Sequence, residues 1–356
     1  MSNCFELIDK LYKNRTLSLE EYEMLLDNQS KENEKYISEY ARKNREEYYG
    51  KDIYVRGLIE ISNICKNDCL YCGIRRSNLN CDRYRIEKEE ILDSCKEGYE
   101  LGFRTFVLQG GEDAYFTDDR LLEIVSKIKE EFPDVAVTLS VGERDETSYR
   151  KLFEAGVDRY LLRHETADKN HYEKIHPVEM SFENRIKCLE NLKRIGYQTG
   201  AGFMVGSPYQ TNKEIAKDLK FIENLKPEMC GIGPFIAHKD TSFKNEKSGS
   251  ISKTLYILSI VRLILPAVLL PATTAVGTLD KEGYEKAILA GANVIMPNLT
   301  PKSVRSKYEL YNKKAHTGVD AGENIRILKE RMNKIGYEII SSRGDAKKEK
   351  ESYGNI

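Results

Sequence analysis

The feature that most constrains the fold is a regular alternation of short apolar runs and longer amphipathic segments from residue 52 onward. The apolar runs are rich in β-branched residues and have the length of strands: 53–61, 103–109, 134–140, 157–162, 197–205, 228–232, 267–270 and 293–296. The segments between them have helical periodicity: 87–101, 118–132, 146–155, 181–195, 212–225, 252–265 and 280–290. Eight strands alternating with helices predict an α/β fold, the (β/α)8 TIM barrel. A doubly wound open sheet is the alternative, but no Gly-x-Gly-x-x-Gly turn follows the first strand.

The segments on either side of this alternation predict additions to the barrel. Ser18-Leu-Glu-Glu21 is a capping box that opens an apolar helix, so residues 1–50 are expected to form an N-terminal helical extension. The barrel itself is assigned to residues 51–300. Residues 301–340 are expected to close the barrel and to add a C-terminal helix near 321–335. Residues 341–356 are charged and poor in apolar side chains, and we expect them to be disordered.

Composition argues against several classes of protein. A net charge of −1 over 356 residues gives no reason to expect nucleic acid or an anionic membrane as a partner. The N-terminus has acidic residues early and no apolar core of a signal peptide. The most apolar run, 257–270, contains Arg262 and Pro266 and is too short to span a bilayer. Eight cysteines lack the density of a secreted disulfide scaffold, so a soluble cytoplasmic protein is expected.

Three cysteines are concentrated in one loop directly after the first predicted strand. Cys65, Cys69 and Cys72 have the spacing C-x3-C-x2-C. Their thiolates could each hold one iron of a [4Fe–4S] cluster, and the iron left without a protein ligand could chelate a small molecule. The alternative is a structural zinc site with Cys81 as fourth ligand, but such sites usually have a different ligand spacing. The sequence therefore predicts a cluster.

Polar or glycine-rich segments follow every predicted strand, at the barrel end where active sites lie. The segments after the second, third, fourth and fifth strands are Gln109-Gly-Gly-Glu112, Ser140-Val-Gly-Glu143, Arg163-His-Glu165 and Gly200-Ala-Gly-Phe-Met-Val-Gly206. Because side chains alternate along a strand, Arg163 and Glu165 should face the lumen and His164 should face away. We therefore interpret His164 as a wall histidine. Arg185, early in the next helix, could bind a carboxylate or could lie in solvent.

The cysteine loop, with Tyr71 before its last cysteine, and the Gly-Gly-Glu segment resemble those of radical S-adenosylmethionine (SAM) enzymes. The resemblance implies one [4Fe–4S] cluster on Cys65, Cys69 and Cys72. It also implies that SAM is the cofactor, cleaved by one electron to methionine and a 5′-deoxyadenosyl radical. By position, it assigns these residues to SAM binding: Tyr71, Gln109, Gly110, Gly111, Glu112, Ser140, Glu165, Arg185 and Met204.

Within this superfamily, six segments taken together resemble the HydE family of [FeFe]-hydrogenase maturases: 62–76, 161–167, 200–206, 231–236, 271–275 and 292–298. This resemblance implies a sulfur-containing substrate, a cysteine-bound iron carbonyl cyanide unit handed on by the maturase HydG. It also implies HydF and an electron donor such as ferredoxin or flavodoxin as partners. By position, it assigns these residues to the substrate pocket: Thr138, Arg163, Thr273, Thr274, Met296, Tyr308 and Tyr311.

The chain departs from part of this family in one respect. Some HydE proteins carry a second, C-terminal cluster, whereas no cysteine follows Cys230 here, so a single cluster is expected. The cysteines outside the loop are expected to be ordinary thiols: Cys4, Cys81, Cys95, Cys188 and Cys230. Two alternatives stay open, a radical SAM mutase acting on an amino acid such as lysine, as in methylornithine synthase, and a non-enzymatic iron–sulfur or zinc protein.

Overall fold

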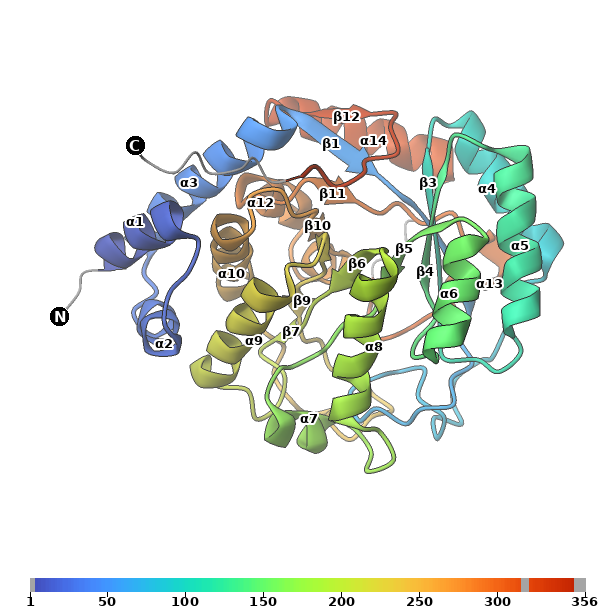
Figure 1. The fold of residues 1–356 in the computed structure, drawn as a ribbon, viewed down its shortest axis with the longest axis horizontal. Coiled ribbons are helices and arrows are strands. Elements are labelled where there is room, and N and C mark those ends of the chain that lie inside the picture. Colours follow the sequence, from blue (N-terminus) through green and yellow to red (C-terminus); the bar gives the residue numbers. More distant parts are fainter. Residues whose placement is uncertain (1–3, 315–319, 349–356) are drawn as a thin grey trace.

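Parallel strands close into a barrel in the computed structural model, which describes residues 4–314 and 320–348 (Figure 1). One sheet has the order β2-β3-β4-β5-β6-β8 and another the order β10-β11-β1-β12. The two sheets join because β1 runs on into β2 through Arg56, and because parallel bridges link Met229 to Leu269 and Leu58 to Asn298. The predicted (β/α)8 barrel is thereby confirmed. The strands of the two sheets are β1 (Asp52–Val55), β2 (Gly57–Ser62), β3 (Thr105–Gly110), β4 (Ala136–Ser140), β5 (Val157–Leu161), β6 (Gln198–Ala201), β8 (Met229–Cys230), β10 (Pro271–Ala272), β11 (Val294–Ile295) and β12 (Glu338–Ile340).

Helices surround this barrel, close to the predicted segments. They are α4 (Lys88–Glu100), α5 (Asp118–Glu131), α6 (Glu146–Glu154), α7 (Lys169–Ile175), α8 (Phe182–Ile195), α9 (Asn212–Leu225), α10 (Ile251–Ile264), α11 (Thr274–Leu279), α12 (Gly283–Leu289), α13 (Lys302–Arg305) and α14 (Ala321–Lys334). Sequence periodicity did not predict α7, α11 or α13, which have seven, six and four residues, because one or two turns give too short a pattern. None of the helices in the described part of the chain has the length and apolar character needed to cross a membrane.

The N-terminal helices lie along one side of the barrel, at the left of Figure 1. They are α1 (Cys4–Asn14), α2 (Leu19–Asp27) and α3 (Lys31–Tyr49). The predicted capping box is present, since Ser18 accepts from the Glu21 amide and the Glu21 side chain accepts from the Ser18 amide. Helix α2 packs against α9 and α3 packs against α10. These helices therefore extend the outer helical layer, and the end of α3 packs against the strands through Tyr49 and Tyr54.

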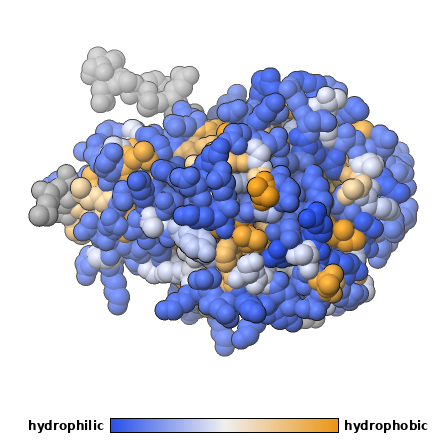
Figure 2. Space-filling view, turned by 90° about the horizontal axis from the view of Figure 1, so that it is seen from below, coloured by the Kyte–Doolittle hydropathy of each residue, from blue (hydrophilic) through white to orange (hydrophobic). Residues whose placement is uncertain are grey.

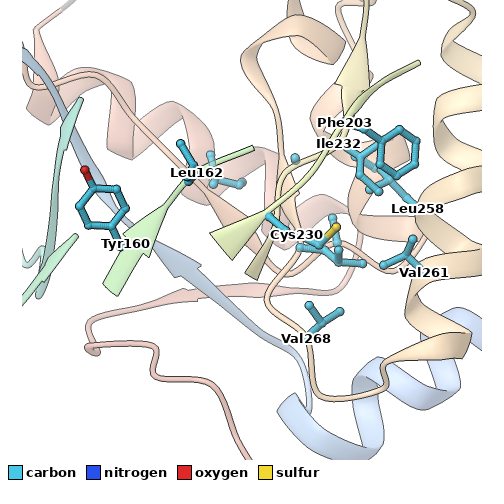
Figure 3. Packing of buried hydrophobic residues seen from close by; sticks show 14 of the residues in the cluster. Tyr160, Leu162, Phe203, Cys230, Ile232, Leu258, Val261 and Val268 are labelled. Carbon is cyan, nitrogen blue, oxygen red and sulfur yellow. The ribbon is translucent and has the colours of Figure 1, made fainter. Parts of the chain in front are cut away.

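The core between the strands and α10 is apolar and tightly filled. Leu258 and Val261 of α10 point toward Phe203 and Ile232 (Figure 3), and all four are fully buried. Burial of side chains of this size contributes roughly 1.5–3 kcal/mol each. Cys230 lies in the same layer with no exposed surface, which confirms that it is an ordinary core thiol.

The end of the chain corrects one prediction. Disorder was expected for residues 341–356, but residues 341–348 lie against the N-terminal ends of the barrel strands, and 349–356 are outside the described residues. Asp345 contacts the buried Arg159 at 2.6 Å, and Arg343 contacts Asp158 at 2.7 Å. The prediction failed because charged composition was taken to mean solvation, whereas the bottom of the barrel supplies partners of opposite charge.

Replacing Asp345 by alanine should lower the free energy of unfolding by about 2 kcal/mol, because Arg159 would stay buried without its carboxylate. Burial alone would raise the pKa of Asp345, but hydrogen bonds from Arg343 and Gln198 and the charge of Arg159 lower it to about 2. The stabilisation should therefore be complete above about pH 4 and be lost as the pH falls toward 2. Urea denaturation measures this. Glu130→Ala, which removes an exposed ion pair with Lys127, is the control and should change little.

Candidate active site

A cavity of about 350 Å³ opens at the C-terminal ends of the barrel strands. All but one of the residues predicted from the sequence line it. They are Cys65, Cys69, Tyr71, Cys72, Gln109, Gly110, Gly111, Glu112, Ser140, Arg163, Glu165, Arg185, Met204, Thr273, Thr274, Met296, Tyr308 and Tyr311. The loop between β2 and α4 lies at the bottom of Figure 1. Figure 2 shows the molecule from that side, and its surface there is mostly hydrophilic with separate hydrophobic spots.

The cysteine loop is held in shape by charged side chains. Arg83 donates to four backbone carbonyls, those of Asn63, Ile74, Arg75 and Asn78, at 2.6 to 3.1 Å. Arg75 forms a two-pronged ion pair with Asp68, both contacts at 2.8 Å. A loop without regular secondary structure needs such substitutes for the missing backbone pairing. Arg75 therefore positions the loop.

The three loop thiols share one cavity but no set of three ligands converges on a single ion. No group of three His, Cys, Asp or Glu in residues 4–314 and 320–348 is placed to hold one metal ion. Cys81, which a zinc site would need, lies outside the cavity lining, with its Sγ 3.5 Å from Asn63 Nδ2. A cubane cluster takes each thiolate on a different iron, so three thiols around one cavity are compatible with a cluster.

Burial disfavours the deprotonated, thiolate form of these three cysteines. It raises the pKa of Cys65 and holds that of Cys69 well above its usual value. Burial, together with the neighbouring Cys65, raises the pKa of Cys72 to about 12. Deprotonated thiolates at such a site need positive charge beside them, which iron supplies.

The Gly-Gly-Glu segment after β3 packs directly on the cysteine loop. A Cβ atom on Gly111 would lie 2.2 Å from the Ile64 carbonyl oxygen, so no other residue fits there without a shift. The Glu112 amide lies 3.3 Å from Cys65 Sγ, and the Glu112 carbonyl accepts from the Lys66 amide at 2.9 Å. The Glu112 side chain lies over Gly142, whose φ is +84°. The segment thereby brings backbone N–H and C=O groups close to a ligand near Cys65.

Arg163 and Glu165 face the cavity together, as predicted, with 3.0 Å between Nη2 and Oε2. Nη2 is thus held in an ion pair, whereas Nε is buried and makes no hydrogen bond within the described residues. The carbonyl of Arg163 accepts from Arg185 Nη1 at 2.6 Å, and Arg185 Nε lies 2.5 Å from Glu143. Arg185 is thus already bound by the protein on two sides. Arg163 keeps donor capacity for a ligand.

His164 faces away from the cavity, which confirms its interpretation as a wall residue. It is fully buried, its Nδ1 accepts from the Gly202 amide at 3.2 Å, and its ring lies beside Phe203 and Phe221. Burial lowers the pKa of His164 to about 3, so the ring is neutral. A neutral, fully packed imidazole positions the turn that carries Arg163 and Glu165.

Thr138 is the one predicted site residue that the structure does not bring to the cavity wall. It lies two residues before Ser140 on β4, paired with Val107 and Arg159, one layer deeper in the barrel. Its hydroxyl is buried and makes no hydrogen bond. Its side chain lies deeper in the barrel than that of Ser140, and its assignment to the substrate pocket stays a prediction.

The mouth of the cavity is narrowed by the segment that follows β11. The Gly73 amide, next to Cys72, donates to the Leu310 carbonyl at 2.8 Å. The Asn312 amide donates to the Ala237 carbonyl at 3.1 Å, on the far side of the mouth. Residues 306–314 therefore connect the cysteine loop to the loop after β9 (Gly233–Pro234). Tyr308 and Tyr311 reach the cavity from this connection.

Several charged cavity residues were missed by sequence reasoning. Arg56 lies deep in the lumen, with Nη1 2.8 Å from Met229 Sδ and with Nε and Nη2 unpaired among the described residues. Glu60 and Lys314 form a buried ion pair at the wall. A signal was available in the first strand, where positions 56, 58 and 60 alternate toward the lumen and two of them are charged.

Comparisons with known proteins agree with this arrangement. A family model described as the radical SAM superfamily matches residues 59–222. The [FeFe] hydrogenase maturase subunit HydE of Thermotoga maritima is 48% identical over 267 residues, 75% of this chain and 76% of that protein. A 3-methylornithine synthase of Methanosarcina acetivorans is 29% identical over 93% of this chain and 92% of its own length. The crystal structure of methylornithine synthase (PylB) matches with a TM-score of 0.81 and 27% identity, over 94% of this chain and 97% of that one. The chain therefore belongs to the radical SAM superfamily of enzymes, in the group that includes HydE.

Proposed function

We propose that this enzyme is a HydE-type maturase that acts on a sulfur-containing, cysteine-bound iron carbonyl cyanide substrate during assembly of the [FeFe]-hydrogenase active site. The observation that carries the proposal is the 48% identity to HydE over three quarters of the chain. The 29% identity to 3-methylornithine synthase is much lower, although its coverage is greater. The HydG and HydF maturases and a ferredoxin or flavodoxin would be its partners, in the cytoplasm.

Membership of the superfamily implies a [4Fe–4S] cluster and SAM. When bound, they supply one-electron cleavage of the SAM C5′–S bond, which yields methionine and a 5′-deoxyadenosyl radical. Cys65, Cys69 and Cys72 would hold three irons, and the absence of cysteine after Cys230 supports a single cluster.

The remaining cavity residues would bind and orient the two ligands. Residues Tyr71, Gln109 to Glu112, Ser140, Glu165, Arg185 and Met204 would contact SAM. Glu165 would accept hydrogen bonds from ribose hydroxyls, and the backbone near Met204 would line the adenine. Arg163, whose Nε has no hydrogen bond within the described residues, would hold a substrate carboxylate. Thr273, Thr274, Met296, Tyr308 and Tyr311 would enclose the substrate and exclude water.

A maturation assay tests this proposal. Anaerobically reconstituted protein is mixed with apo-[FeFe]-hydrogenase, HydG, HydF and SAM, and hydrogen evolution is followed with and without it. Hydrogen evolution that depends on this protein is expected. Release of 5′-deoxyadenosine without any effect on maturation would contradict the maturase role and leave the radical chemistry in place.

A mutase acting on an amino acid is the second candidate, because the fold match to methylornithine synthase extends over nearly the whole chain. The same reconstituted protein is incubated with SAM, a reductant and L-lysine. Formation of a rearranged amino acid would favour this candidate over the maturase.

A further inference from the structure

A buried ion pair lines the substrate side of the cavity. Lys314 and Glu60 are 5% and 0% exposed at their side chains, and both reach the cavity wall. Removing two charges from water costs several kcal/mol per ion, so a buried pair stabilises a fold little. This pair also lies at the C-terminal end of the barrel, where function concentrates. Both facts suggest a role in ligand binding.

Glu60 holds Lys314 in a fixed position. Lys314 Nζ donates to Glu60 Oε1 and, at 3.0 Å, to the Tyr308 carbonyl, and it lies 4.6 Å from the centre of the Tyr308 ring. The other oxygen of Glu60 accepts from Asn298 Nδ2 at 2.9 Å. An ammonium group has three N–H donors. Within the described residues two of them have protein acceptors, which leaves one for the cavity.

Lys314 and Arg163 approach the cavity from different sides. Glu60 belongs to β2, whereas Arg163 follows β5, and β3 and β4 lie between these strands around the barrel. Among the described residues, Arg163 Nε is buried without a hydrogen bond while its Nη2 is paired with Glu165, and Lys314 has one N–H without an assigned acceptor. Arg163 and Lys314 thus present cationic donors on two sides of the cavity, in addition to Arg56 deeper in the lumen, and they suit a ligand with negative charge at two places.

We propose that Lys314, held by Glu60, is a second anion anchor that binds the negatively charged group at the sulfur end of the substrate, while Arg163 binds the carboxylate end. The inference rests on the proposed function for the identity of the substrate as a cysteine derivative. It adds that this substrate carries an anionic group on its side chain, as a thiolate-bound iron cyanide unit does. A neutral side chain of similar shape would bind more weakly.

Two small probes measure how much a negative charge on the ligand side chain contributes to binding. L-Cysteate and L-serine share one amino acid skeleton, but L-cysteate carries a negative sulfonate where L-serine has a neutral hydroxyl. Binding is measured by anaerobic calorimetry on the holoenzyme with its cluster oxidised and SAM saturating, so that the probes do not compete for the open iron. We expect wild type to prefer L-cysteate by at least about 10-fold, the factor that one charged hydrogen bond supplies.

Lys314→Met should reduce this preference to about 2-fold or less, since the anion loses the charged donor beside Glu60. Lys314→Arg should restore most of it. Lys313→Met, the same change at the neighbouring exposed lysine, is the control and should keep the wild-type preference. SAM binding and iron content should be equal in all four proteins. If Lys314→Met does not fold, Lys314→Gln, which can still donate to Glu60, takes its place.

Three outcomes would overturn the proposal. Wild type could show no preference for L-cysteate, Lys314→Met could keep the wild-type preference, or Lys313→Met could lose it equally. Each readout is a ratio of binding constants and needs no turnover. A failure here with a positive maturation assay would refute the anion anchor alone, whereas a negative maturation assay would refute the proposed function.

Discussion

Replacing Cys69 by serine is expected to remove the iron–sulfur cluster and all SAM cleavage. A serine hydroxyl is a poor ligand for iron at neutral pH, and two remaining thiolates cannot hold a cluster that has one open iron already. Iron content should fall from about four per chain to below one. The brown absorption of the cluster and the release of 5′-deoxyadenosine should disappear together, as measured by iron analysis, visible spectroscopy and chromatography after anaerobic reconstitution.

Cys81→Ser is the matched control for this experiment. Cys81 is partly exposed, lies in the same connection between β2 and α4, and does not line the cavity. The Cys81→Ser variant should therefore bind a full cluster and cleave SAM like the wild-type protein. Loss of metal from both variants to the same degree would contradict a three-cysteine cluster site and would support a site with four cysteine ligands, such as zinc.

The barrel and the cysteine loop could be predicted because local sequence patterns indicate both. The alternation of strand and helix repeats along the chain, and C-x3-C-x2-C lies within eight residues. The sequence also predicted that the residues after each strand lie close together, because the C-terminal ends of parallel barrel strands meet at one face. For that reason Gln109, Arg163, Thr273 and Met296, each after a different strand, share one cavity as expected.

Contacts made when the barrel closes could not be predicted. Glu60 and Lys314 are 254 residues apart, and neither belongs to a recognisable motif. Arg56 lies within a predicted strand and belongs to no motif, yet it reaches the cavity. Thr138 and Ser140 could not be ranked by depth, because the tilt and stagger of the strands set which layer meets the cavity. The ion pair between Asp345 and Arg159 forms only in the tertiary fold, so the sequence alone does not indicate it.

Replacing Arg163 by methionine is expected to separate SAM cleavage from the maturation reaction. Arg163 Nε is a buried donor without a hydrogen bond within the described residues. Losing one charge-assisted hydrogen bond costs roughly 1.5–3 kcal/mol, or about 10- to 100-fold in substrate binding. Hydrogenase maturation should therefore fall by about 10- to 100-fold at low substrate concentration. The cluster should stay intact, because the ion pair of the Arg163 side chain is with Glu165 and not with a cysteine.

The substitution Arg163→Met should leave the backbone around residue 163 unchanged. Arg185 donates to the carbonyl of Arg163, and that oxygen is kept in any variant, so the turn after β5 should stay in place. Arg163→Lys keeps the charge but loses the planar pair of donors, and its activity should fall between wild type and Arg163→Met. Arg194→Met, which removes an exposed arginine paired with Glu146, is the control and should change nothing. If Arg163→Met instead loses iron or unfolds at lower urea concentration, its role is to hold Glu165 in the fold, and the substrate carboxylate must be bound elsewhere.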